Sequence, residues 1–436
     1  MNEGREWLER AQRQGNDTSA AFANVLVGAA RLAFAQDDFE RAVALLERAV
    51  PLARSRDPET LMLSLAWLGH ALWHRDDRTR AIALCEESHA LCRSAGAGWA
   101  AAVTLAEIAT VVLHEGEPER AIRLLEESLA LYRKAGDSAG IAQCLHQLGV
   151  QATNQGDYAR AASLMQEALE LQRQLGRKPA VAASLVRLGR IALQRGQYED
   201  AIALLEAGTA LTDELGKTWD APYRKAGLGL AVLATGDVTR AAGLFEESLA
   251  VGEPAAHRGS GSFRAGSADS LLGLGIVARY RDDHARARRL LEDSLDAFRT
   301  AGDIDGAAAA LHQLGLLAQT ENDFDREGEL LRESLASRRA RGDRLGVAEC
   351  VEAMVVVAHR RGAFERSAQL AGLAASLRGQ IGAPRWAIDR AAYDHEVAAL
   401  RASMGEHAFA AACAAGTALS PADAEQAFVQ LVRTPG

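Results

Sequence analysis

Lysine is almost missing from this sequence of 436 residues, since it occurs only at Lys134, Lys178, Lys217 and Lys225. Arginine therefore carries nearly all of the positive charge, a bias typical of a GC-rich bacterial genome. Acidic residues outnumber basic residues by 58 to 49, which gives a formal net charge of −9 at pH 7. A chain with this balance repels a phosphate backbone, so the sequence predicts no direct binding of nucleic acid.

Cysteine is too sparse and scattered for a disulfide framework. Five cysteines occur, an odd number, which favours a reducing compartment: Cys85, Cys92, Cys144, Cys350 and Cys413. The first residues, MNEGREWLERAQRQ, are charged from Glu3 onward and lack the apolar core of a signal peptide, and no apolar run is long enough to span a bilayer. We therefore expect a cytoplasmic protein without a membrane segment.

Aromatic residues make up only 5% of the chain and proline occurs nine times, so strands have little support and helix breakers are few. Hydrophobic residues nevertheless reach 48% and charged residues 25%, which is ordinary for a folded protein and excludes a disordered one. The abundant Ala, Leu, Arg and Glu lose little side-chain freedom in a helix. The composition predicts an all-α fold.

A pattern of about forty residues repeats along the chain, most clearly in QGDYARAASLMQEALELQRQLG from Gln155 and RGQYEDAIALLEAGTALTDELG from Arg195. A turn residue recurs with spacings of 39, 40, 40, 40, 40, 46, 40 and 40, at Asp37, Asp76, Gly116, Gly156, Gly196, Gly236, Asp282, Asn322 and Gly362. The pattern therefore predicts nine units.

Each unit predicts two packed helices. A small residue, which a close helix crossing requires, stands seven residues before the turn: Gly69, Ala109, Gly149, Gly189, Gly229, Gly275 and Gly315. Five residues after the turn comes an alanine, and then an apolar pair such as Leu45–Leu46. These apolar positions recur at i, i+3, i+4 and i+7, so each helix has one stripe that the partner helix and the next unit must cover. Stacking of the units follows.

A second glycine, twenty residues after the turn, closes the second helix in most units: Gly96, Gly136, Gly176, Gly216, Gly302, Gly342 and Gly382. It suits the position after a helix where the backbone becomes left-handed. Asp137, Asp303 and Asp343 follow it and are expected to cap the next helix.

The small residue, the turn with Gly-Asp-Tyr or Phe and the alanine of the second helix together resemble the tetratricopeptide repeat in a forty-residue form. The resemblance covers about residues 21–380 and implies a right-handed superhelical solenoid of about nine repeats, between a capping helix at 1–20 and a helical cap at 381–436. We expect looser packing where the sequence departs from the pattern, at Glu327, Ser367, Arg78, Pro118, Val238 and His284.

Both ends resemble a narrower group. EGREWLERA at Glu3 to Ala11 and the segment from Ala391 to Phe428 are similar to the flanks of the array in MalT/LuxR-like and AfsR-like bacterial transcriptional regulators, which are STAND signal-transduction ATPases. In those regulators a nucleotide-binding module precedes the array and a DNA-binding domain is attached at either end. The 436 residues contain neither module, so the resemblance implies a sensor region or a stand-alone relative, with an ATPase or DNA-binding module as a partner in the same or another chain.

Enzyme motifs are weak. Leu215-Gly216-Lys217-Thr218 ends like a phosphate loop, but Leu211 stands where the first glycine is required. The Gly273-Leu-Gly275 stretch is similar to a dinucleotide fingerprint, yet it lies inside a predicted helix where Gly275 is the crossing residue. No nucleophile triad or carboxylate pair stands out. We expect a non-catalytic protein that needs no cofactor.

Cys85, His89 and Cys92 fall at i, i+4 and i+7 and would place three metal ligands on one helix face, and His70 with His74 forms a second such pair. Cys85, however, takes the second position of an apolar pair, where a buried cysteine packs as a small hydrophobe. We therefore expect packing instead of a metal site.

The resemblance places a ligand-binding concave surface on the first helices of the repeats. Large aromatics beside arginine suit the recognition of a peptide or an acidic group, although Trp67 and Trp73 also fit inter-helix packing. Counting the small residue as position eight, positions two, five, six, nine, twelve and thirteen are expected to face the groove. The candidate surface comprises Trp67, His70, Trp73, His74, His114, Gln143, His146, Asn154, Arg187, Arg190, Tyr223, Arg279, His312 and Gln319, with Glu107, Asp269 and Gln313 in equivalent positions.

The one long spacing comes from an insertion at 253–267 that is rich in Gly, Ser and Pro. It predicts a loop that is either a mobile linker or a lid with Phe263 and Arg264 as ligand contacts.

The sequence as a whole predicts a non-catalytic binding solenoid whose groove takes a peptide, a protein segment or a small effector. We expect the sensory or partner-binding region of a bacterial transcriptional or signalling regulator. A stand-alone scaffold or adaptor is the alternative, and a metal-dependent enzyme using Cys85, His89 and Cys92 is the least favoured.

Overall fold

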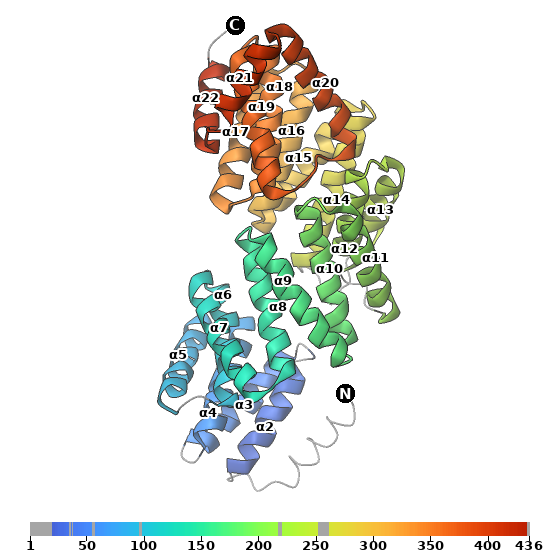
Figure 1. The fold of residues 1–436 in the computed structure, drawn as a ribbon. Helices are drawn as coiled ribbons and strands as arrows, with labels where there is room; N and C mark the ends of the chain where they lie inside the picture. Colours follow the sequence, from blue (N-terminus) through green and yellow to red (C-terminus); the bar gives the residue numbers. More distant parts are fainter. Residues whose placement is uncertain are drawn as a thin grey trace. The chain divides into compact units, whose positions relative to one another are not determined.

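The structure, a computed structural model, describes residues 20–34, 36, 38–54, 57–95, 98–216, 220–251 and 261–433. Every regular element in these ranges is an α-helix, which confirms the predicted fold class (Figure 1). Helices α2 to α19 form nine consecutive pairs, and α20 to α22 follow them. The predicted capping helix at 1–20 lies almost wholly outside the described residues. We call the first helix of each pair the A-helix and the second the B-helix.

The chain divides into two compact units, Met1–Gln151 with Ser163–Gly176, and Ala152–Ala162 with Arg177–Gly436. In the first unit each of the helices α2 to α7 packs on its chain neighbour, and α2, α4 and α6 also contact one another in order. This unit holds α2 (Ala20–Phe34), α3 (Phe39–Arg54), α4 (Pro58–His74), α5 (Arg78–Ala95), α6 (Trp99–His114), α7 (Pro118–Ala135) and most of α8 (Ser138–Asn154) and α9 (Tyr158–Gln174).

The second unit continues the same alternation, and its A-helices α10, α12, α14, α16 and α18 contact one another in order. Helix α20 follows α19 in the chain and also contacts α12, so the array of this unit curves back toward its own beginning. The helices are α10 (Lys178–Gln194), α11 (Tyr198–Glu214), α12 (Ala221–Ala234), α13 (Val238–Ala250), α14 (Gly261–Tyr280), α15 (His284–Ala301), α16 (Ile304–Thr320), α17 (Phe324–Arg341), α18 (Arg344–Arg360), α19 (Phe364–Ile381), α20 (Ala387–Met404), α21 (Glu406–Gly416) and α22 (Pro421–Arg433).

The predicted turn positions have left-handed backbone wherever they are described, glycine or not. The non-glycine examples are Asp76 with φ 64°, Asp282 with φ 57° and Asn322 with φ 59°. Asp and Asn tolerate this conformation better than other side chains because their short polar groups bond locally. The glycine that closes the B-helix in most repeats is left-handed too, from Gly136 to Gly382. Asp37 and Gly96 lie outside the described residues.

The small residue of each A-helix marks a close helix crossing, as predicted. A Cβ at Gly189 would lie 2.6 Å from Leu205, and one at Gly275 would lie 2.7 Å from Leu291. In both cases the neighbour stands sixteen residues later, on the B-helix of the same pair. The helices of a pair therefore approach too closely for a larger side chain at this position.

Buried alanines and leucines of the predicted stripes form the core of each unit. The substitutions that suggested looser packing are themselves buried: Glu327 and Ser367 have no exposed surface. The Ser367 hydroxyl donates to the Val355 carbonyl at 2.7 Å. A polar side chain is thus accommodated at these alanine positions because it bonds inside the pair.

A hydrogen bond from a B-helix serine to an A-helix carbonyl recurs along the array and was not predicted from the sequence. A serine seven residues after the helix-B alanine donates to the backbone of its own A-helix, as Ser128 does to the Ala102 carbonyl at 2.6 Å and Ser334 to the Ala308 carbonyl at 2.7 Å. Ser88, Ser248 and Ser294 do the same. The signal was present, since these serines stand in one register of the repeat.

The expected loop at 253–267 is shorter than predicted, because α14 begins at Gly261. Gly266, inside that helix, lies so close to Pro222 and Tyr223 of α12 that a Cβ there would meet their backbone at 2.2 Å. Helix packing against α12 thus orders a stretch whose composition favours a loop. The side chains of Phe263 and Arg264 lie outside the described residues, so the lid stays untested.

The predicted capping aspartates are confirmed. Asp303 accepts from the Gly306 amide at 2.9 Å, Asp343 from the Gly346 amide at 2.9 Å, and Asp137 from two amides of α8. Each satisfies an amide that the first turn of a helix leaves without a partner.

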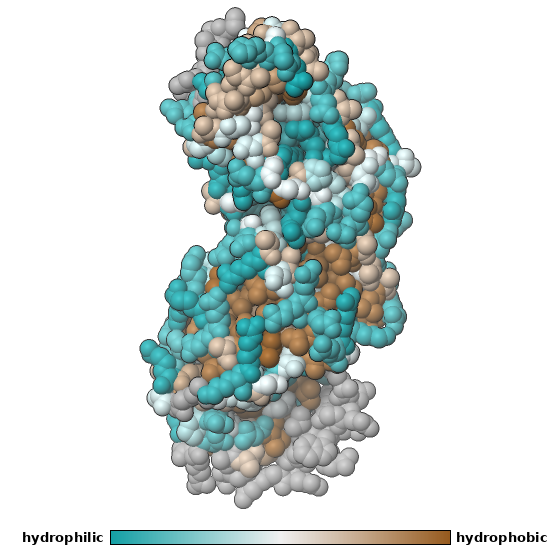
Figure 2. All heavy atoms as spheres, in the orientation of Figure 1, coloured by the Kyte–Doolittle hydropathy of each residue, from teal (hydrophilic) through white to brown (hydrophobic). Residues whose placement is uncertain are grey.

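Figure 2 shows hydrophilic residues over most of the visible face, interrupted by smaller areas of hydrophobic residues. None of the helices among the described residues combines the length and the apolar character needed to cross a membrane.

Candidate partner-binding surfaces

The A-helices of the second unit place arginine, tyrosine and aspartate together on one face. Arg190 of α10 lies over the ring of Tyr223 of α12, 4.3 Å from its centre, and its Nη2 is 3.0 Å from Oδ2 of Asp269 of α14. Three successive A-helices therefore meet at one cluster. The predicted neighbours Arg190 and Tyr223 are brought together, whereas Arg187 is half-buried one turn earlier on α10.

This cluster is strongly desolvated. Burial raises the pKa of Asp269, and the Arg190 guanidinium opposes that shift. Arg190 Nη1 is also buried and has no hydrogen-bond partner among the described residues. A buried N–H without an acceptor costs about 1–3 kcal/mol, so this cluster is energetically strained by its desolvated donor.

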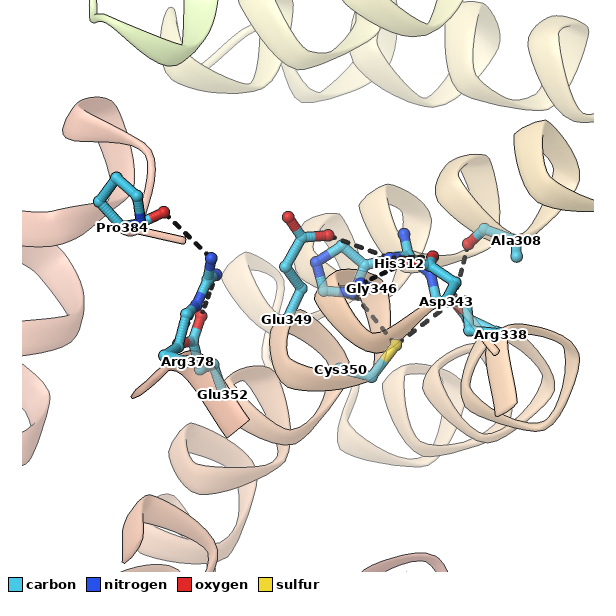
Figure 3. A network of polar contacts seen from close by, with 11 residues as sticks. Ala308, His312, Arg338, Asp343, Gly346, Glu349, Cys350, Glu352, Arg378 and Pro384 are labelled. Atoms are coloured by element: carbon cyan, nitrogen blue, oxygen red, sulfur yellow. Dashed lines mark hydrogen bonds and ion pairs between the residues drawn. The ribbon is translucent and has the colours of Figure 1, made fainter. Parts of the chain in front are cut away.

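A second network joins α16, α17 and α18 (Figure 3). Arg338 Nη1 lies 3.0 Å from Glu349 Oε2 and 3.4 Å from Asp343 Oδ2. His312 is buried beside it, with Nδ1 3.8 Å from Cys350 Sγ. Burial holds the pKa of His312 well below its usual value, and the positive charge of Arg338 adds to this effect. His312, a predicted groove residue, is therefore a neutral part of the interior.

The next polar group holds the segment that follows α19. Arg378 binds both carboxylate oxygens of Glu352, at 3.0 and 2.9 Å, and its Nη1 donates to the Pro384 carbonyl at 3.1 Å (Figure 3). Arg385 Nη2 reaches the same carboxylate at 2.9 Å. Two arginines on one buried carboxylate fix the path of the chain here.

Glu349 and Glu352 were missed in the sequence, although the register contains them. Counting Val355 as position eight of α18 places them at positions two and five, which were expected to face the groove. The arginines that pair with them come from B-helices or from beyond the array. The periodic pattern of the A-helices therefore does not predict these pairings.

In the first unit, aromatic and histidine rings of α2 to α4 cluster around Phe34. Its ring centre lies 5.1 Å from that of Trp67, 4.5 Å from His70 and 5.6 Å from His74, and His74 stacks on Phe39 at 4.2 Å. The predicted trio of Trp67, His70 and His74 is thus brought together. Ring packing of this kind supports the packing interpretation of Trp67.

One polar contact ties this ring cluster to the next A-helix. His70 Nδ1 lies 2.7 Å from Oε2 of the buried Glu107 of α6. Trp67 Nε1 is buried with no hydrogen-bond partner among the described residues, while Trp73 lies under the guanidinium of Arg78, 5.1 Å from its ring centre.

The remaining candidate residues are dispersed. Gln143 and Asn154 are exposed, His146 is half-buried, Arg279 is mostly buried, and the side chain of His114 lies outside the described residues. Gln319 donates to Glu327 within its own helix pair. Membership of a binding surface stays a prediction for all of these side chains.

The metal and nucleotide alternatives gain no support. Cys85 is buried, burial raises the pKa of its thiol to about 12, and its Sγ lies 2.8 Å from where a Cβ on Gly69 would stand. The described residues contain no group of three or more His, Cys, Asp or Glu side chains that could hold a metal ion. Gly216 is a left-handed turn residue, and Lys217 and Thr218 lie outside the described residues.

The fold is shared with known proteins. The tetratricopeptide repeat family matches residues 60–134 and 135–214. No curated protein matches the chain. Among solved structures, the apo form of the quorum sensor NprR from B. thuringiensis aligns with a TM-score of 0.53 and 16% identity over 76% of this chain and 91% of that one. The apo form of RapI aligns with a TM-score of 0.53 and 12% identity over 64% of this chain and 97% of that one.

A third similar structure is the Signal Transduction ATPase with Numerous Domains (STAND) protein with a tetratricopeptide repeat sensor from Pyrococcus horikoshii. It aligns with a TM-score of 0.50 and 19% identity over 63% of this chain, which spans 41% of that protein's length. At such identities the likeness shows the fold alone. Residues 60–214 match the tetratricopeptide repeat family, and the described residues as a whole form an all-α array of helix pairs of the same kind.

Proposed function

We propose that the chain binds a peptide or protein segment on the A-helix face of the second unit, as the sensory or partner-binding part of a signalling regulator. The observation that carries the proposal is the Arg190, Tyr223 and Asp269 cluster, in which a guanidinium N–H is buried without an acceptor. Arginine and tyrosine are both enriched at the energetic centres of protein interfaces.

Three features support binding over catalysis. The thiols of Cys85, Cys144 and Cys350 have pKa values raised by burial, which suppresses the reactive thiolate. A curved array of repeats offers a long surface to an extended or helical segment. Two proteins of this fold are named as a quorum sensor and a STAND protein with a repeat sensor, which fits a sensory role.

A peptide-display selection on the purified full chain tests this proposal. A selected peptide is titrated calorimetrically against the wild type and against Arg190→Gln, and we expect the variant to lose at least tenfold in affinity. Arg299→Gln is the matched control, because Arg299 pairs with Glu333 on the exposed surface of the B-helices. Equal affinities for the wild type and Arg190→Gln, with unchanged thermal stability, would place binding elsewhere.

A further inference from the structure

Residues 383–389 follow α19 and include the first residues of α20. We call them the return segment. Helix α19 ends at a left-handed Gly382, and residues 383–386 have no helical structure before α20 begins at Ala387. In the repeats before it, each connection joins a B-helix to the A-helix of the next pair. Here the chain instead runs across helices that lie far earlier in the sequence.

The beginning of the return segment contacts the turn between α10 and α11. Tyr198 Oη donates to the Pro384 carbonyl at 2.9 Å, across 186 residues of sequence. Ala383 is buried, and Gly196 comes so close that a Cβ there would lie 2.8 Å from the Pro384 ring. Only a glycine at this turn leaves room for the segment.

The middle of the segment lies on the hydrophobic core of the second unit. Trp386 and Ile388 pack against the cluster formed by residues of α10 to α17. Ala387 is 3.9 Å from where a Cβ on Gly236 would stand, at the turn between α12 and α13. The segment therefore crosses two consecutive repeat turns and then reaches a third repeat.

The end of the segment meets α14 through its acidic side chain. Tyr280 Oη donates to Asp389, and Arg279 Nη2 lies 3.7 Å from the same carboxylate oxygen. Arg279 is mostly buried, and neither its Nε nor its Nη2 makes a hydrogen bond to a described residue. Asp389 thus balances the charge of Arg279 but accepts no hydrogen bond from its Nε or Nη2. A carboxylate close enough to hydrogen-bond would satisfy these donors.

The segment is accessible enough to be displaced. Pro384 and Ala387 are exposed, and Trp386 and Ile388 are only half-buried. Its contacts are those of a bound peptide: a main-chain carbonyl held by Tyr198 and Arg378, two apolar anchors and one carboxylate.

We propose that the return segment is an internal ligand on the A-helix face of the second unit. The partner of this face is a peptide segment of the same chemistry: non-helical up to a large aromatic residue and helical after it, with an aliphatic residue two positions and an acidic residue three positions beyond the aromatic one. This inference rests on the proposed function, since it names the partner class and the competitor for that same face. The tethered segment competes at an effective concentration of about millimolar, so a partner must be tight or abundant to replace it.

The test uses a fluorescein-labelled peptide spanning residues 381–394 and the full-length protein. Trp386→Ala combined with Asp389→Ala removes an anchor and the carboxylate of the internal copy, and we expect this variant to bind the peptide at least tenfold more tightly than the wild type by fluorescence anisotropy. His395→Ala is the matched control, because His395 is exposed on the same helix. It should behave as the wild type.

Equal binding to the wild type and the double variant, or binding to neither, would overturn the inference. Circular dichroism melting shows whether the double variant is folded, and Trp386→Phe with Asp389→Asn is a milder pair that must shift affinity in the same direction. A displayed peptide that binds through Arg190 while the 381–394 peptide binds no variant would leave the proposed function standing and reject the internal ligand. Failure of both peptides would reject both.

Discussion

Glu327 departs from the repeat pattern by placing an acidic residue at a buried position. It occupies the helix-B alanine position, has no exposed surface and accepts a hydrogen bond from Gln319. Burial raises its pKa from the ordinary 4.5 to about 8, against the smaller lowering effect of the Gln319 hydrogen bond. At neutral pH the carboxyl group is therefore largely protonated in the folded protein.

The first prediction concerns the pH dependence of stability. Between pH 4.5 and 8 the folded state holds a proton on Glu327 that the unfolded state has released, so the stabilisation is complete below pH 4.5 and is lost as the pH rises through 8. We expect the free energy of unfolding of the wild type to fall by an amount on the order of a few kcal/mol relative to Glu327→Gln between pH 6 and pH 9. Urea unfolding at several pH values measures this.

Glu329→Gln is the control for this prediction, since Glu329 lies two residues away and its side chain is 68% exposed. Its stability curve should follow the wild type. Parallel curves for the wild type and Glu327→Gln would mean that Glu327 titrates normally.

Among the elements, the pairing of helices depends on glycines that sit opposite large side chains. The ring of Phe245 on α13 is fully buried between two A-helices. A Cβ at Gly229 of α12 would lie 2.5 Å from this ring, and a Cβ at Gly273 of α14 would lie 2.2 Å from it. The Gly273-Leu-Gly275 stretch, similar to a nucleotide fingerprint in the sequence, is therefore explained by helix packing on both of its glycines.

The second prediction follows from that geometry. Gly273→Ala places a methyl group inside the volume of Phe245, and overpacking of a core costs about 1–3 kcal/mol. We expect a lower midpoint of thermal unfolding, measured by circular dichroism. Gly243→Ala on α13 is the matched substitution in open space, where the gain in helix propensity stabilises by roughly 0.5–1 kcal/mol. Similar midpoints for the two variants would show that Phe245 relaxes without cost.

At the scale of the whole molecule, the chain consists of two units whose internal contacts run from each helix to its neighbours. In such an array, the free energy of unfolding is approximately the sum of the stabilities of the single repeats and of the interaction energies between adjacent repeats. A local defect should therefore loosen the unit that contains it before it affects distant repeats.

The third prediction tests this with Leu105→Ala. Leu105 is buried in the core of α4 to α7, where removal of a leucine side chain costs about 2–5 kcal/mol. We expect faster amide hydrogen exchange in α4 to α7 and unchanged exchange in α16 to α19, measured by mass spectrometry. Leu175→Ala, at an exposed leucine of the same unit, should change neither region. Uniformly faster exchange in Leu105→Ala would mean that the array unfolds as one cooperative body.

The sequence by itself determined the helix pairs, the turn positions and the crossing residues. These features are local, because each repeat needs the same residue types at the same positions. Asp76 occupies a left-handed turn and Gly189 a close helix crossing, and equivalent residues recur in the other repeats. The same periodic register predicted that Arg190 and Tyr223 share a face. Repetition made the pattern readable without any tertiary information.

Only the tertiary structure decided which residues from distant repeats of the second unit contact one another. Arg190 pairs with Asp269 two repeats away, and Tyr198 binds Pro384 across 186 residues. Such contacts depend on the small rotation between successive repeats, which accumulates over several units and leaves no mark at any single position. The return segment, with its Pro384 and Trp386, breaks the forty-residue register, so its place on the A-helix face follows from the curvature of the array and from no motif of its own.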